Sequence, residues 1–117
     1  MFRIDGTTIT LSRGDTGEVS IAATGYTFGS NDRALFTMRN AGTKEVKMRR
    51  ILEITDNTVT VTFVNSDTDN LDAGKYEWDI RYVINPIYDD GDIVDGDEVI
   101  TPQDPMVINL KTTVGQI

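Results

Sequence analysis

The stretch Lys75-Tyr76-Glu77-Trp78-Asp79-Ile80-Arg81-Tyr82-Val83 alternates apolar and charged side chains along most of its length. Successive side chains of a β-strand point to opposite faces, so this stretch is predicted to be a strand with one buried face and one solvated face. The apolar face carries Tyr76, Trp78, Ile80 and Tyr82. Aromatic residues with this spacing on a central strand usually pack between sheets. We therefore interpret the stripe as core rather than as a platform for stacking sugar rings.

Strand patterns continue on both sides of this stretch. Residues 58–64 alternate in the same way and are predicted to turn Val59, Val61 and Phe63 toward the core. Further strands are predicted over residues 3–4, 7–11, 18–22, 33–39 and 106–113. The pair Asp5-Gly6 predicts a tight hairpin in which both residues have positive φ. Within residues 45–54 the apolar period slips by one residue near Arg50, which predicts a β-bulge there, with a short helix as the alternative.

Two segments break the strand pattern. Residues 65–74 are predicted to form one helical turn, which Ser66 or Asp67 caps and Gly74 ends in a left-handed conformation. Residues 85–98 are predicted to form an acidic loop.

Short strands at intervals of roughly ten residues indicate a β-sandwich or a small barrel. We predict an all-β fold, a single immunoglobulin-like β-sandwich of about seven short antiparallel strands, in one domain over residues 1–117 with a short tail from about residue 114.

Composition restricts the classes of partner. The chain has 117 residues, a formal net charge of −8 and no cysteine, so no disulfide can hold it together. A net negative charge argues against binding to nucleic acid, which needs a basic surface, and against docking on anionic lipid. The first residues lack the basic and apolar regions of a signal peptide, and no apolar run is long enough to cross a membrane. We therefore expect synthesis and folding in a reducing cytosol.

The residue types also argue against catalysis. The chain has no histidine and no cysteine, which removes the commonest general base, the thiolate nucleophile and the usual zinc ligands. It contains no glycine-rich phosphate-binding motif. The remaining possibility is a pair of carboxylates, which 19 acidic residues make unavoidable and uninformative. We predict a protein that is not an enzyme and that has no catalytic residues and no cofactor.

Two short motifs suggest binding sites, and each has a simpler interpretation. The acidic segment offers Asp90, Asp92, Asp95 and Asp97 as weak calcium candidates. Their spacing departs from that of an EF-hand loop, because Val94 occupies a position that needs a ligand and Asp95 a position that needs glycine. We therefore favour a solvated hairpin and expect no metal site. Arg13-Gly14-Asp15 matches an integrin-recognition tripeptide, but a turn that needs glycine explains it equally well.

Three segments resemble small β-sandwich modules of tailed bacteriophages, especially the N-terminal domain of the baseplate upper protein and related neck and fibre-attachment proteins. The first segment is Leu11-Ser12-Arg13-Gly14-Asp15-Thr16, followed by the strand with Val19 and Ile21. The second is Leu71-Asp72-Ala73-Gly74-Lys75-Tyr76-Glu77-Trp78-Asp79-Ile80-Arg81. The third runs from Val99-Ile100-Thr101-Pro102 through the last strand to Val114-Gly115. The second pattern also occurs in many immunoglobulin-like domains.

The resemblance implies a virion structural protein of the tail, baseplate, neck or head surface, made in the bacterial cytoplasm. Its partners would be other virion proteins or copies of itself. Apolar residues near the two ends are the predicted interface candidates: Phe2, Ile4, Val114 and Ile117. The alternative is a surface-exposed carbohydrate- or calcium-binding β-sandwich module.

Overall fold

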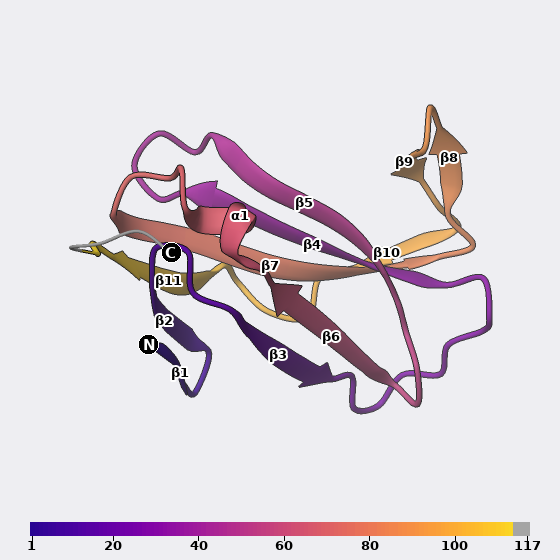
Figure 1. The fold of residues 1–117 in the computed structure, drawn as a ribbon. Coiled ribbons are helices and arrows are strands. Elements are labelled where there is room, and N and C mark those ends of the chain that lie inside the picture. Colours follow the sequence, from indigo (N-terminus) through magenta and orange to yellow (C-terminus); the bar gives the residue numbers. More distant parts are fainter. Residues whose placement is uncertain (114–117) are drawn as a thin grey trace.

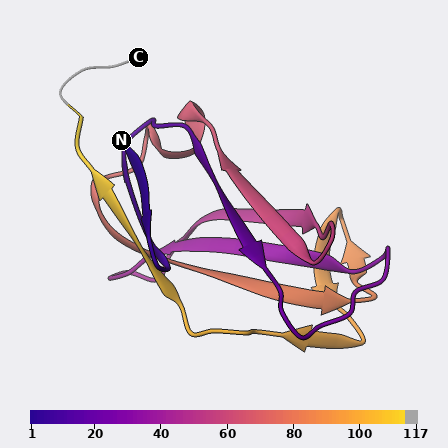
Figure 2. The ribbon, with the colours of Figure 1, turned by 90° about the horizontal axis from the view of Figure 1, so that it is seen from below.

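The computed structural model describes residues 1–113 and places two β-layers face to face (Figure 1). The larger layer runs in the order β1 (Phe2–Asp5), β2 (Thr8–Ser12), β11 (Met106–Lys111), β7 (Gly74–Ile84), β4 (Arg33–Asn40) and β5 (Val46–Glu53), and β10 (Glu98–Ile100) also pairs with β7. The smaller layer consists of β3 (Gly17–Ala22) and β6 (Thr58–Phe63), which run side by side across one face of the larger sheet (Figure 2). The remaining elements are α1 (Asn65–Thr68) and a hairpin of β8 (Ile87–Asp89) and β9 (Asp92–Asp95).

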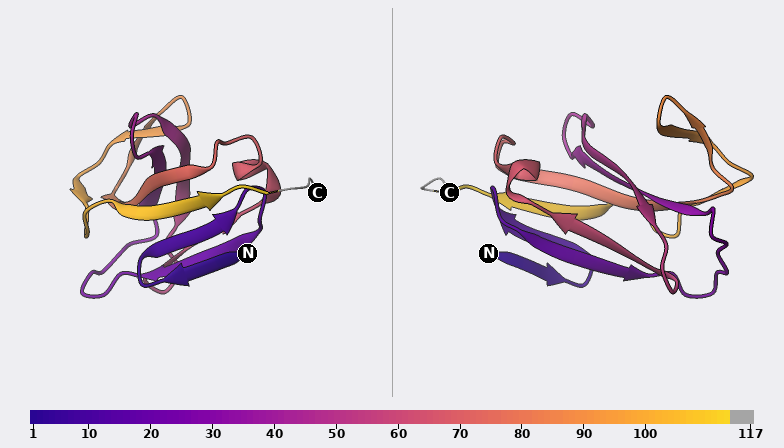
Figure 3. Two further views of the ribbon diagram at one scale, coloured as in Figure 1. Left: turned by 90° about the vertical axis from the view of Figure 1, so that its left-hand side faces the viewer. Right: turned by 45° about the vertical axis from the view of Figure 1, so that its right-hand side comes forward.

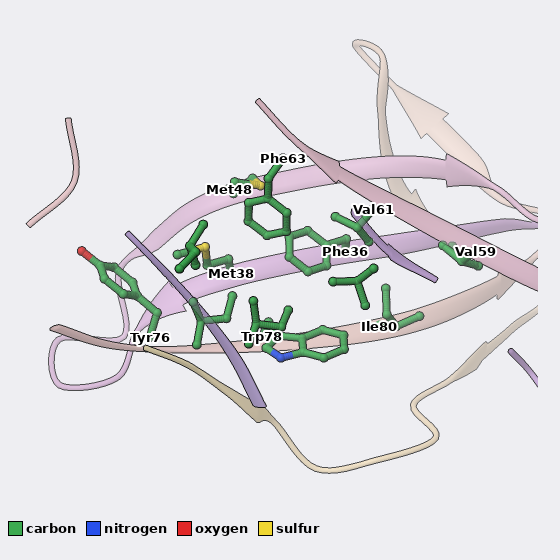
Figure 4. Close-up of a cluster of buried hydrophobic side chains, with 14 of the residues drawn as sticks. Phe36, Met38, Met48, Val59, Val61, Phe63, Tyr76, Trp78 and Ile80 are labelled. Carbon is green, nitrogen blue, oxygen red and sulfur yellow. The ribbon is translucent and has the colours of Figure 1, made fainter. Parts of the chain in front are cut away.

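The core lies between these layers and follows the alternation of the strands. On β7 the predicted stripe points inward, and Trp78 is 4% exposed with its ring centroid 5.9 Å from that of Phe36. The inward residues of β6, Val59, Val61 and Phe63, are also buried, as predicted. Figure 4 shows these side chains meeting between the layers. The prediction that the aromatic stripe is core is therefore confirmed.

The sandwich framework is immunoglobulin-like. It consists of β2, β11, β7, β4 and β5 in one layer and β3 and β6 in the other, which agrees with about seven strands. The Tyr76 hydroxyl donates to the Asp72 carbonyl oxygen at 2.6 Å. This hydrogen bond is the tyrosine corner found in such sandwiches. One detail of the prediction is wrong, because β2 and β11 pair in parallel. The short strands β1, β8, β9 and β10 are additions to the framework.

Several local predictions need correction. The first hairpin forms, but its turn is Gly6-Thr7, and of the pair Asp5-Gly6 only Gly6 has positive φ. Within residues 45–54, for which a short helix was the alternative, the structure has the strand β5. The irregularity in its pairing lies at Lys47 rather than near Arg50. Gly74 has the expected positive φ, at 150°. It does so as the first residue of β7 and not as the left-handed end of α1.

The acidic segment of residues 85–98 is largely strand rather than loop. Its β8–β9 hairpin stands on the side of the molecule away from β3 (Figure 3). Arg49 of β5 holds the hairpin by donating to the Asp92 carboxylate and the Ile93 carbonyl oxygen, both at 3.1 Å. At the base of the hairpin, Gly96 lies so close to Val83 that an added Cβ would be 2.5 Å from its side chain. No helix within residues 1–113 has the length and apolar character needed to cross a membrane.

Candidate functional site

The small layer has a free strand edge on β3. Among the described residues β3 pairs with β6 alone, in a continuous antiparallel register. The Ala23 N–H, which follows β3, donates toward the β6 side, to the Asn57 carbonyl oxygen at 2.8 Å. Backbone groups alternate in direction along a strand, so those of Glu18, Ser20 and Ala22 point away from β6. These three residues therefore present donors and acceptors that an added strand can bind.

An apolar groove runs beside this edge. It has a volume of about 510 Å³ and lies between β3, the β1–β2 turn and the segment that leads into β11. Its lining includes Val19, Ile21, Tyr26, Trp78, Ile80 and Met106. The side chains of Trp78 and Ile80 are almost fully buried, and Ile21, Tyr26 and Met106 are half-buried. A strand bound along β3 can therefore place alternate side chains in an apolar channel while its backbone bonds the edge.

The β3 edge has only one of the devices that usually protect an edge strand, the charged side chain of Glu18. The other devices are lysine, proline, a bulge or an inward-pointing charge. The sequence of β3 is Gly-Glu-Val-Ser-Ile-Ala, and its pairing with β6 shows no irregularity. The edge strand β5 differs from β3 in three of these respects, because it carries Lys47, the inward-pointing Arg50 and a register shift. Of these two edges, β3 is the one suited to pairing.

Arg50 covers one end of the opposite edge of the small layer, which is that of β6. This residue lies opposite Phe36 in the β4–β5 register, which places it on the core-facing side of β5. Its guanidinium donates to the Thr62 carbonyl oxygen at 2.6 Å and pairs with the Asp67 carboxylate. Thr62 is an outward-pointing position of β6 by the same alternation that applies to β3. The slip in the apolar period near Arg50 therefore reflects an inward-pointing charge and not a bulge. That slip is the sequence signal that could have revealed the role of Arg50.

Of the predicted interface residues, the structure describes Phe2 and Ile4. Phe2 is half-buried, with its ring 5.7 Å from that of Phe63 and packed over Gly17, and its role as an interface residue stays a prediction. Ile4 is 43% exposed and lines the groove beside β3. Val114 and Ile117 lie outside the described residues. Of the two described residues, Ile4 is the one that lines the candidate site.

The calcium candidates are not brought together as a ligand set. Asp92 pairs with Arg49, the Asp95 carboxylate accepts from the Gly96 N–H at 2.8 Å, and Asp97 accepts from the Asn85 amide at 2.9 Å. Within residues 1–113 there is no group of three or more acidic side chains placed to hold a metal ion.

The tripeptide Arg13-Gly14-Asp15 packs against its surroundings instead of forming a projecting loop. Arg13 donates to the Leu71 carbonyl oxygen at 3.4 Å, and the Gly14 N–H donates to the Thr68 hydroxyl at 2.8 Å. The Asp15 carboxylate accepts from the Ser12 N–H at 2.9 Å. These contacts support the interpretation of the tripeptide as a structural turn.

A second hollow, of about 180 Å³, lies on the outer face of the larger sheet. Four basic and two acidic side chains line it: Arg39, Lys44, Arg49, Arg81, Glu77 and Asp79. Glu77 pairs with Lys44 at 3.0 Å and with Arg39 at 2.7 Å, and hydrogen bonds from these two cations lower the pKa of the Glu77 carboxyl. Arg49 is engaged by Asp92. Because its charges largely neutralise one another, this hollow is a weaker candidate than the β3 edge.

No protein-family model and no curated protein matches this chain. The resemblance to phage modules therefore depends on the three sequence segments alone and stays a prediction. One of these segments contains Asp72 and Tyr76, which form the tyrosine corner. Since that corner is a property of immunoglobulin-like sandwiches in general, this segment speaks for the fold rather than for a phage origin.

Proposed function

We propose that this chain is a non-enzymatic protein-interaction and assembly module, and that its binding element is the free edge of β3. The observation that carries the proposal is the row of outward backbone groups at Glu18, Ser20 and Ala22 beside an apolar groove. Main-chain hydrogen bonds to an added strand supply affinity, and side chains placed in the groove supply specificity. A partner that binds in this way needs an extended segment with alternating apolar residues.

We further propose that the assembly is a tailed-phage virion, with the chain as a structural part of the tail, baseplate, neck or head surface. The resemblance of the three sequence segments supports this setting, and so does the lack of histidine and cysteine, because an assembly part needs no reactive groups. Partners would be other virion proteins or further copies of the chain. The net charge of −8 speaks against nucleic acid as the partner.

Proline substitutions on the two edges of the small layer give a matched test. Ser20→Pro removes an N–H that points away from β6, so the β3–β6 pairing should survive while the edge loses a donor. Thr60 lies directly opposite Ser20 in the register, and Thr60→Pro removes the equivalent outward N–H from β6. Both variants also lose the same side-chain hydrogen bond between Ser20 and Thr60. Their comparison therefore separates the edge from general destabilisation.

The measurement is capture from a lysate of phage-producing bacteria, with each variant immobilised and the retained proteins identified by mass spectrometry. We expect the wild type and Thr60→Pro to retain the same virion proteins and Ser20→Pro to lose them. Retention that is equal for both proline variants would refute the β3 edge as the binding element. Retention of a glycan or metabolite in place of any virion protein would refute the assembly function.

A further inference from the structure

We propose that the β3 edge pairs with β3 of a second copy of this chain, antiparallel about a two-fold axis at Ser20. This inference rests on the proposed function, since it names the strand that the edge receives. A two-fold interface is self-complementary, so the same strand must satisfy itself when it is turned around. The sequence of β3 meets that condition in one register better than in the others.

In that register Ser20 lies opposite Ser20, Glu18 opposite Ala22 and Val19 opposite Ile21 of the second copy. The outward-pointing residues of one strand then face the outward-pointing residues of the other. Each such pair exchanges two hydrogen bonds in an antiparallel ladder, which gives about six bonds across the axis. The result is a continuous sheet in the order β6, β3, β3, β6.

Charge and strand length favour this register over its neighbours. Glu18 is the only charged residue of β3, and here it faces Ala22 instead of a second carboxylate. A register that centres on Glu18 would oppose two like charges, which destabilises a cross-strand pair. A register centred on Val19 or Ile21 would leave part of the three-residue edge without a partner in β3. Pairing at Ser20 therefore uses the whole edge without placing two carboxylates opposite one another.

The apolar groove gives the pairing a source of affinity beyond its hydrogen bonds. Val19 and Ile21 line the groove, and in the paired sheet each becomes the cross-strand neighbour of the other in the second copy. The grooves of the two copies open along the paired edges, so they join beneath the extended sheet. We expect Ile4, which is 43% exposed at the rim of the groove, to become less exposed in the pair.

A single cysteine tests the register directly. The chain contains no cysteine, so Ser20→Cys introduces one thiol, and in the pair it would meet its own copy across the axis. The Cα atoms of a hydrogen-bonded antiparallel pair are about 5.5 Å apart, which is within the range that a disulfide spans. Under mild oxidation we expect Ser20→Cys to form a covalent species of twice 13.0 kDa. Thr60→Cys, on the opposite edge at a similarly exposed position, should form no covalent dimer, because its thiol lies away from the axis.

A charge exchange at the same position tests it without a covalent bond. Ser20→Lys and Ser20→Glu should each weaken dimerisation about fivefold in sedimentation equilibrium, because like charges meet at the axis. Mixing the two variants should restore the dimer as a heterodimer, since opposite charges then meet. Circular dichroism of each variant confirms that the sandwich is folded.

Two results would overturn the inference. One is a wild-type chain that stays monomeric up to about 1 mM, where even a weak dimer would be half formed. The other is a Ser20→Cys variant that crosslinks no faster than Thr60→Cys. Both measurements use the purified chain alone, so their failure leaves the proposed function to its own test, the capture of virion proteins by the β3 edge.

Discussion

Trp78→Ala should lower the free energy of unfolding by about 3–4 kcal/mol. A tryptophan side chain of this kind buries about 150–250 Å², and at about 25 cal/mol per Å² its transfer from water is worth roughly 4–6 kcal/mol, part of which alanine retains. Two further losses add to the change. The Trp78 Nε1 donates to the Thr7 carbonyl oxygen at 3.2 Å, and the Phe36 ring loses its neighbour.

The groove limits the size of this effect. Trp78 lines it, so the space left by alanine opens toward solvent and does not become an enclosed cavity. The additional cost that an enclosed cavity imposes is then reduced, which places the change at the lower end of the range of about 3–5 kcal/mol for tryptophan in a core.

Urea denaturation followed by far-UV circular dichroism measures the change. Trp78→Phe is the matched control, because it keeps an aromatic ring in the core and loses the hydrogen bond to Thr7, for an expected cost of about 1–1.5 kcal/mol. A loss below about 1 kcal/mol for Trp78→Ala would refute the burial argument. Since Trp78 is the only tryptophan, a wild-type emission spectrum typical of indole in water would refute it independently.

Three further predictions concern other parts of the sandwich. Tyr76→Phe removes the donor of the tyrosine corner and should destabilise by about 1–2 kcal/mol in urea denaturation; an unchanged midpoint would show that the corner contributes nothing. Gly96→Ala should lower the melting temperature clearly, because the added Cβ would be 2.8 Å from the Ile84 carbonyl oxygen as well as close to Val83; an unchanged melting temperature would show that the hairpin base relaxes freely. The Glu77 carboxyl has a pKa below its usual value of 4.5, so its contribution to stability is present above pH 4.5 and is lost as the pH falls through the lowered pKa. Glu77→Gln should therefore melt below the wild type near pH 7, and the gap should close as the pH falls through the lowered pKa; a gap that is constant with pH would contradict the ion pairs.

The parts of the fold that the sequence predicted are those in which one physical rule decides the outcome. β6 and β7 have strict alternation with apolar residues on one face, and a one-residue shift would expose every core side chain, so their orientation is determined locally. The position of the first turn is not determined by local sequence alone. Both Asp5-Gly6 and Gly6-Thr7 satisfy a two-residue hairpin, and the cross-strand pairing of Ile4 with Ile9 selects the second.

The candidate site was less predictable, because it depends on which strands end up without a neighbour. Nothing within the sequence of β3 indicates that Ser20 lies on an unpaired edge, since that follows from the order of strands across both layers. Arg50 left a trace, an interruption of the apolar period. A bulge and an inward charge produce the same interruption, and the register of Arg50 opposite Phe36, together with its contact with Thr62, distinguishes them.

The asymmetry between the two edges of the small layer determines the valence of any assembly built through it. Arg50 bonds the Thr62 end of the β6 edge and Thr55 bonds its Thr58 end, so among the described residues of this layer β3 is the edge that is open along its length. A building block with one such place stops growing after one addition, whereas unlimited fibres need two. Replacement of Arg50 by a small side chain would free the Thr62 end of β6, which moves the layer toward the two places that end-to-end polymerisation requires.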